Sequence, residues 1–281
     1  TFEAHLTKNY VDFAEGSIAV SNMLFGARDI GVMLNGRLCD DLIRYRLAVL
    51  NGAGENKGDN NGAKDIAARL VLNPFRNAEN EILSSVWVGA SGTFGDQNTD
   101  YSTTSFKTTA GTEFIIFADE TFHRGDRTRL GTEFALPYRS ASLKAEWMRM
   151  WLDDFQKPPM EEDFQFSSWY VSATCLLTGE NKCLTKIIPN RPFDPYQGMW
   201  GAFELAARYA EYNADEDLFA LGMATGTDRA QAYTLGLNWY LNEFVRVTFN
   251  YEHTELDDAL LVDDKTIDDE SVYIVQMQLE F

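Results

Sequence analysis

The sequence predicts an all-β fold, a transmembrane antiparallel barrel, and three observations lead to this fold class. Apolar and polar residues alternate over segment after segment, which is the two-residue period of strands, whereas no helical stripe is sustained. Several segments exceed the usual length of soluble strands and reach the roughly nine to eleven residues that cross a bilayer at a tilt. Long polar connectors alternate with very short turns such as 241–243, which is the hairpin pattern of outer-membrane barrels.

The composition excludes several other classes of protein. The 281 residues include 24 Lys plus Arg against 43 Asp plus Glu, and the net charge of −19 argues against a nucleic-acid partner. Apolar residues make up 45%, and no run approaches the roughly 18 consecutive apolar residues of a membrane helix. Cys39, Cys175 and Cys183 form no CxxC pair, so neither a zinc site nor a disulfide framework is expected, although a Cys175–Cys183 bridge stays open.

Twelve segments with strand periodicity follow one another along the chain. They cover residues 30–37, 42–51, 65–73, 82–93, 112–118, 127–137, 140–152, 165–178, 198–212, 231–241, 243–254 and 271–281. Connectors 55–65, 153–163, 213–217 and 255–270 are polar and mostly acidic, as expected of external loops. Counting back from a periplasmic C-terminus, however, puts residues 51–64 on the periplasmic side. One strand is therefore expected to be miscounted near residues 94–118.

The last segment carries the most specific signal. Its apolar face ends on a terminal aromatic residue, like the signal by which outer-membrane barrels are recognised for assembly, and consists of Tyr273, Val275, Met277, Leu279 and Phe281. A buried C-terminal strand of a soluble protein would show a similar alternation. The pattern of the other strands is therefore needed to distinguish an outer-membrane barrel from a soluble protein.

The same parity sorts the other strands into two faces, because strand side chains alternate with a period of two. It puts Leu235 and Phe249 outside, and Glu204 and Arg208 inside. An apolar exterior around a polar interior is the reverse of a soluble core and predicts a water-filled lumen. Aromatic residues near strand ends suit an interfacial girdle, among them Trp151, Trp169, Trp200, Tyr209, Trp239, Phe244, Tyr251 and Phe281.

The expected wall has a different charge from the connectors. Seven basic residues are candidates for the lumen, against five acidic ones: Arg44, Arg46, Arg69, Arg129, Lys144, Arg208 and Arg246, against Glu133, Glu146, Glu204, Glu252 and Glu280. The whole chain has the reverse ratio, so basic residues concentrate on the wall. Two interpretations stay open, an anion path and cross-strand ion pairs that stiffen the barrel.

Several segments resemble one known family. Several stretches look like the phosphate-selective porin O and P family, namely residues 200–209, 233–240 and 245–251, together with 28–32, 144–147, 168–174 and 177–180, and the resemblance covers most of the chain in order. It implies a trimeric porin of about sixteen strands in the outer membrane of a Gram-negative bacterium. It also implies loops that fold into the pore and line a cationic constriction for anions such as phosphate.

The resemblance further implies that residues 1–281 form one porin domain that lacks its N-terminal strands, with residues 1–29 as a constriction loop. Thr1 follows no charged and apolar leader, so any export signal was removed or lies upstream. In residues 6–16 the family's basic positions are occupied by Asn9 and Gly16, and Lys8 stands one place away. Residues 180–197 form a basic connector on the expected periplasmic side, and its length and charge predict that it folds into the lumen.

The predicted anion path combines the wall, the constriction region and this connector. It consists of Lys8, Arg28, Arg44, Arg46, Arg69, Arg129, Lys144, Lys182, Lys186, Arg191, Arg208 and Arg246.

No catalytic constellation is predicted. His5, His123 and His253 lack partner motifs, no phosphate-binding glycine loop is present in the sequence, and neither a cofactor nor a metal site is expected. We expect a passive channel for small hydrophilic solutes that favours anions, with the lipid bilayer, lipopolysaccharide and a homotrimer as partners. The alternative is a non-conducting structural or adhesive barrel whose acidic loops bind divalent ions.

Overall fold

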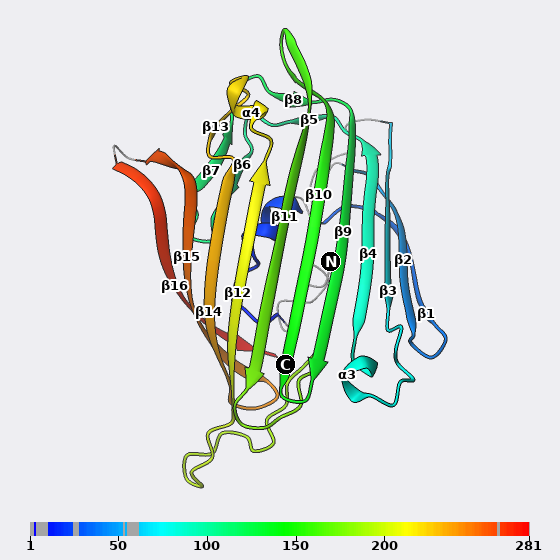
Figure 1. The fold of residues 1–281 in the computed structure, drawn as a ribbon, viewed down its shortest axis with the longest axis vertical. Coiled ribbons are helices and arrows are strands. Elements are labelled where there is room, and N and C mark those ends of the chain that lie inside the picture. The colour runs from blue at the N-terminus through cyan, green and yellow to red at the C-terminus, as the bar shows by residue number, and fades with distance from the viewer. Residues whose placement is uncertain are drawn as a thin grey trace.

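The computed structural model describes residues 3, 11–24, 28–52, 54, 62–262 and 265–280. Its main feature is one curved antiparallel wall in which successive long strands are neighbours (Figure 1). In order these are β1 (Gly31–Leu38), β2 (Ile43–Leu50), β3 (Asp65–Leu72), β4 (Trp87–Asp96), β9 (Asp126–Tyr138), β10 (Ala141–Lys157), β11 (Met160–Leu176), β12 (Ala202–Ala214), β14 (Arg229–Tyr240), β15 (Val245–Val262) and β16 (Lys265–Leu279). The all-β antiparallel prediction is confirmed.

The remaining elements belong to the connections and to the N-terminal segment. They are α2 (Ile18–Met23), α3 (Glu81–Ser84), β5 (Thr99–Asp100), β6 (Ser105–Lys107), β7 (Glu113–Phe117), β8 (Phe122–His123), α4 (Asp217–Ala220) and β13 (Ala224–Gly226). Strands β13, β7 and β6 form a separate three-stranded sheet, and α2 contacts β10, β11 and β12. Among the described residues, no helix is long and apolar enough to cross a bilayer.

The strand expected at 112–118 is β7, which lies in the small sheet and not in the wall. Eleven of the twelve expected segments therefore correspond to wall strands, and the miscount expected near residues 94–118 is confirmed. With β7 removed from the count, the end of β2 at Leu50 and the start of β3 at Asp65 lie at the end of the wall opposite to the end of β16. Whether further strands precede this wall stays a prediction.

The predicted parity of the C-terminal strands matches their burial. Tyr273 is 79% exposed and Leu235 61% exposed, whereas Glu204 and Asn238 are 0% exposed. The inward positions are even-numbered on β10, β11, β12, β14, β15 and β16. They are odd-numbered on β3, β4 and β9, because the register aligns Arg69 with Ser91 and Ser91 with Gly131.

The interior is polar over only part of its height, which corrects the expectation of a polar lumen throughout. In the half nearer the end of β16, the inner face carries Lys144, Glu204, Arg208 and other polar residues. In the other half the inner face of β10 to β15 is apolar, and it packs against the β4–β9 connector and α2 in one core. The aromatic members of this core are Tyr101, Phe106, Phe114, Phe117, Phe155, Phe164, Phe166, Tyr170 and Tyr212.

A second layer of chain makes this core possible, because inward apolar side chains can be shielded from water by the segments folded over them. In the sequence, residues 147–152 already depart from alternation, since Trp147, Met148, Met150, Trp151 and Leu152 put apolar groups on both faces of β10.

Candidate functional site

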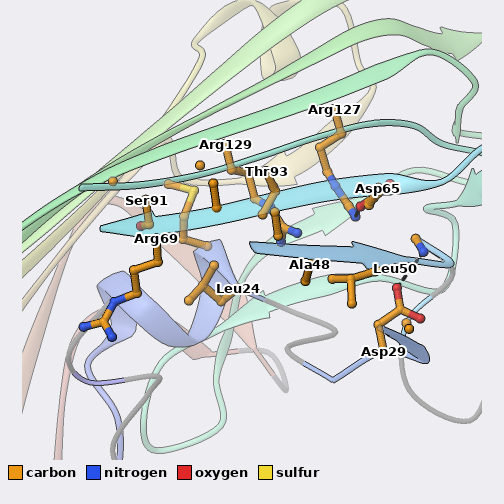
Figure 2. Close-up of a pocket in the computed structure, with 18 of the residues that line it drawn as sticks. Leu24, Asp29, Ala48, Leu50, Asp65, Arg69, Ser91, Thr93, Arg127 and Arg129 are labelled. Carbon is orange, nitrogen blue, oxygen red and sulfur yellow. Dashed lines mark hydrogen bonds and ion pairs between the residues drawn. The ribbon is translucent and has the colours of Figure 1, made fainter. Parts of the chain in front are cut away.

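A cavity of about 960 Å³ lies on the inner side of the wall, between α2 and strands β1 to β4 and β9. Figure 2 shows three of its arginines, Arg69, Arg127 and Arg129, around the same space as Leu24 and Leu50. Arg28 and Arg46 also line it, together with the carboxylates of Asp29 and Asp65.

The strand register brings the arginines together. Arg46 on β2 is aligned with Arg69 on β3, and Thr93 on β4 is aligned with Arg129 on β9. Directly aligned residues on neighbouring antiparallel strands point to the same face. Arg127 follows on that face, since it stands two residues before Arg129.

Two of these arginines form ion pairs with carboxylates. Arg69 donates from Nε and one terminal nitrogen to the two carboxylate oxygens of Glu133, at 2.8 and 2.6 Å. Arg127 lies 3.2 Å from Asp65 Oδ2, and Asp65 Oδ1 accepts a hydrogen bond of 2.7 Å from Gln97. Gly95 leaves room for this group, because a Cβ there would lie 2.0 Å from Asp65 Oδ1.

Arg129 differs from Arg69 and Arg127 in its hydrogen-bond partner. Its Nε donates to Thr93 Oγ1 at 2.9 Å, and among the described residues no carboxylate oxygen lies within ion-pair distance of its guanidinium. Arginine keeps its charge at any physiological pH. The cavity therefore has a cation whose charge is not balanced by an adjacent carboxylate of the described chain.

A second cluster of charges lies in the polar half of the interior, where the N-terminal segment crosses the wall. Asp12 accepts hydrogen bonds from Lys144 at 2.7 Å and from Lys182 at 2.8 Å, and Lys182 also forms an ion pair with Glu204. Burial by itself would raise the pKa of Asp12, but the adjacent charges of Lys144 and Lys182 outweigh it and hold that pKa well below its ordinary value.

Arg208 and Arg246 bind the same N-terminal segment. Arg208 pairs with Glu3 at 2.9 Å and with Glu252 at 3.2 Å, and its guanidinium lies 4.4 Å from the centre of the Phe13 ring. Arg246 donates to the carbonyl oxygen of Val11 at 2.7 Å. The described part of residues 1–29 is thus held against the inner face, and its role as a constriction stays a prediction.

The helix that follows is also fixed in place. Ser17 caps α2 by accepting a hydrogen bond from the Val20 amide on its side-chain oxygen, and Ser168 on β11 donates to the Ala19 carbonyl at 2.9 Å. Asn22 donates to the carbonyl oxygen of Lys107 on β6 at 2.9 Å. Met23 of this helix belongs to the apolar core and also lines the arginine-lined cavity, so α2 borders both.

The remaining residues of the predicted path lie elsewhere. Arg44 forms an ion pair with Asp41 and stacks over Trp87, at 4.2 Å from the ring centre, and its hydrogen bonds and charge lower the pKa of the turn residue Asp41. Lys186 lies 3.3 Å from Glu280, and Arg191 is exposed. Lys8 and the terminal Phe281 lie outside the described residues, whereas the four other assembly-signal side chains, Tyr273, Val275, Met277 and Leu279, are exposed on the outer face.

The connector between β11 and β12 turns inward over residues 182–187, where Leu184 packs against Val71 and Ala135 and Ile187 packs against Tyr240. The expectation that it folds into the lumen is therefore confirmed for this part and corrected for the part that follows. Lys182 is buried in the lumen, but Phe193 packs on the outward-facing Trp239, with ring centres 5.4 Å apart, and on Trp200 at 5.8 Å. The rest of the connector lies beyond the wall at the end of β16 (Figure 1). Its apolar and aromatic residues favour this position over a polar lumen.

Sequence reasoning missed Arg127, Asp65, Thr93 and Asp12. Arg127 shares its strand and parity with the predicted Arg129, so the alternation rule would have found it. Asp12 had no comparable signal, because its partners are 132 and 170 residues away. Among the described residues, no group of three His, Cys, Asp or Glu side chains is arranged to hold a metal ion.

Comparisons with known proteins agree with this architecture. A family model described as phosphate-selective porin O and P matches residues 3–281. Porin O of Pseudomonas aeruginosa is 26% identical over 126 residues, which is 43% of this chain and 28% of that protein.

Solved structures with little sequence similarity share the fold. In-vitro folded OmpT, an outer membrane protein of Vibrio cholerae, aligns with a TM-score of 0.56 and 12% identity, over 99% of this chain and 73% of that one. A high-pH structure of Pseudomonas putida OprB aligns with a TM-score of 0.53 and 10% identity, over 93% of this chain and 62% of that one.

Proposed function

Because this chain belongs to the phosphate-selective porin O and P family, we propose that it is a passive diffusion channel for small hydrophilic solutes that favours anions such as phosphate. The chain is an outer-membrane β-barrel of a Gram-negative bacterium. The partners that follow from this function are the lipid bilayer, lipopolysaccharide, small anionic solutes and two further copies of the chain in a trimer.

The arginine-lined cavity is the observation that carries the proposal. Among the described residues, five arginines line the cavity, Arg28, Arg46, Arg69, Arg127 and Arg129, against the carboxylates of Asp29 and Asp65 in its lining and of Glu133 on Arg69, which is an excess of two positive charges within this set. Such an excess raises the local concentration of anions, and it acts at short range, whereas exposed acidic loops are largely screened beyond a Debye length of about 8 Å.

The apolar core supports one route for solutes. Ions avoid a packed apolar region because they lose their hydration there without compensation. The core fills the interior beside β10 to β15 in the half away from the end of β16, so the route in that half follows β2, β3, β4 and β9. In this orientation the long connections at the end of the wall away from the end of β16, such as residues 97–125, lie on the external side of the membrane. No catalytic role is proposed.

Reversal potentials in planar bilayers with a salt gradient test the proposal. We expect the protein to conduct with anion preference. Arg129→Gln should lower the anion-to-cation permeability ratio, because it removes a cation that has no adjacent carboxylate among the described residues. The matched control is Arg191→Gln, which removes an exposed arginine outside the cavity. Absence of conductance would favour the alternative, a structural or adhesive barrel.

A further inference from the structure

The arginine-lined cavity also has an apolar side. Its polar part consists of the arginines with Ser91 and Thr93, and its apolar part includes Leu24, Met33 and Leu50. Figure 2 shows Leu24 and Leu50 around the same space as Arg129 and Thr93. A site that served hydrated inorganic ions alone would gain nothing from this apolar lining.

The apolar side has a fixed position. Leu24 is the C-cap of α2, its amide donates to the Val20 carbonyl at 3.0 Å, and its side chain packs against the apolar core. Leu50 ends β2 and is aligned with Asp65 on β3 and Gly31 on β1. Preorganised apolar groups favour binding because no further side-chain ordering is needed.

The arginine side of the cavity can bind the anionic head group of a ligand. The Arg129 guanidinium is oriented by Thr93 through Nε, and its terminal nitrogens make no hydrogen bond to the described chain. Two parallel hydrogen bonds from a guanidinium match the two oxygens of a carboxylate. The cavity volume of about 960 Å³ lies near the upper end of the roughly 300–1,000 Å³ typical of small-molecule sites.

We propose that this cavity binds amphiphilic organic anions of the monocarboxylate class, with the carboxylate at Arg129 and Thr93 and the apolar part against Leu24 and Leu50. This inference rests on the proposed function and narrows its substrate class. An organic anion gains from both sides of the cavity, whereas inorganic phosphate gains from the arginine side alone.

Benzoate and inorganic phosphate are the two probes. We expect benzoate to reduce the chloride current at lower concentrations than phosphate does. Leu24→Ser should weaken the apparent affinity for benzoate by at least about fivefold, because it removes apolar contact with the ligand. It should change the apparent affinity for phosphate by less than about twofold, because it removes no charge. Arg129→Gln should weaken the binding of both benzoate and phosphate.

Leu221→Ser is the matched control, since Leu221 is a partly exposed leucine outside the cavity. If Leu24→Ser does not fold, Leu50→Ser tests the same contact. Equal potency of benzoate and phosphate, or equal losses of both in Leu24→Ser and Leu50→Ser, would overturn the proposal. Calorimetric titration of the detergent-solubilised protein with benzoate measures binding without conduction, so a failure of the channel function is distinguishable from a failure of this site.

Discussion

Asp12 and Lys182 form a buried ion pair of 2.8 Å across 170 residues of sequence. The pair joins the N-terminal segment to the connector between β11 and β12, and Asp12 simultaneously binds Lys144 on β10 at 2.7 Å. One carboxylate thus holds three parts of the chain together on the inner face of the wall.

Asp12→Asn should therefore destabilise the protein more than an ordinary loss of an ion pair. The change leaves Lys144 buried with no carboxylate partner among the described residues, and breaking a buried pair from one side costs about 3–5 kcal/mol. Urea unfolding of the detergent-solubilised protein measures the free energy of unfolding. Glu280→Gln is the control, because its pair with Lys186 is partly exposed and such pairs contribute about 1 kcal/mol or less. Similar losses in the two variants would contradict this account of Asp12.

His123 predicts a pH dependence of the β4–β9 connector. Burial, and next the charge of Arg127, lowers the pKa of His123 from its ordinary value of 6.5 to about 4. The unfolded connector therefore binds the proton more tightly than the folded one does. The stability is complete above pH 6.5 and is lost as the pH falls towards 4, by about 3 kcal/mol in all.

Hydrogen exchange of residues 97–125 between pH 7 and pH 4.5 measures this loss. His123→Phe should remove most of the dependence, because Phe fits the neighbouring rings of Tyr101 and Phe155 and takes up no proton. The same acid-induced opening in His123→Phe would assign the effect to other groups.

Phe106 lies at the centre of the apolar core that fills one side of the interior. Its ring centre is 5.4 Å from that of Phe117, 5.5 Å from Tyr212 and 5.8 Å from Phe166. Phe106→Ala should lower the free energy of unfolding by about 3–5 kcal/mol, and it should increase current noise because the connector packs less tightly. Phe75→Ala, at a residue 48% exposed in the β3–β4 turn, is the control for both measurements.

Adding a single methyl group at Gly95 should change the ion pair that lines the cavity. A Cβ at this position would lie 2.0 Å from Asp65 Oδ1, so Gly95→Ala should displace Asp65 from Arg127 and Gln97. Gly62→Ala is the control, since a Cβ there meets nothing within 4 Å. We expect Gly95→Ala alone to lower the unfolding midpoint in urea and to raise the anion-to-cation permeability ratio, because Arg127 loses its carboxylate.

Periodicity was sufficient to predict the wall strands and their outward faces, since lipid imposes one rule on every strand and the rule has a period of two. The position of β7 and the content of the lumen could not be predicted in this way. Tyr101, Phe106 and Phe117 belong to a connector in which only residues 112–118 have the expected periodicity of a wall strand, and their burial depends on contacts with β10, β11 and β12 far along the chain. Most basic residues of the lumen were found, with Arg127 as the exception. Which of them have buried carboxylate partners depends in part on Asp12 and Glu3, for which the sequence offered no signal.

Lys182 has buried carboxylate partners, whereas Arg129 has no carboxylate partner among the described residues. Lys182 lies with Lys144, Asp12 and Glu204 in a cluster whose formal charges sum to zero. Two unit charges about 4 Å apart interact by roughly 4 kcal/mol at an effective dielectric near 20, so the opposite charges of this cluster largely cancel for a passing ion. Replacing Lys182 and Glu204 together by glutamine preserves that sum. The amide introduced in place of the Glu204 carboxylate can still accept a hydrogen bond from Tyr240, as the carboxylate does at 2.7 Å.

The double variant should therefore leave the reversal potential in a salt gradient unchanged, whereas Arg129→Gln should shift it towards the cation value. The free energy of unfolding of both proteins is measured alongside, so that a selectivity change is not confused with a loss of structure. A shift in the double variant as large as in Arg129→Gln, with the fold intact, would mean that solutes reach Lys182 and that the route runs beside β11 and β12 as well as beside β9.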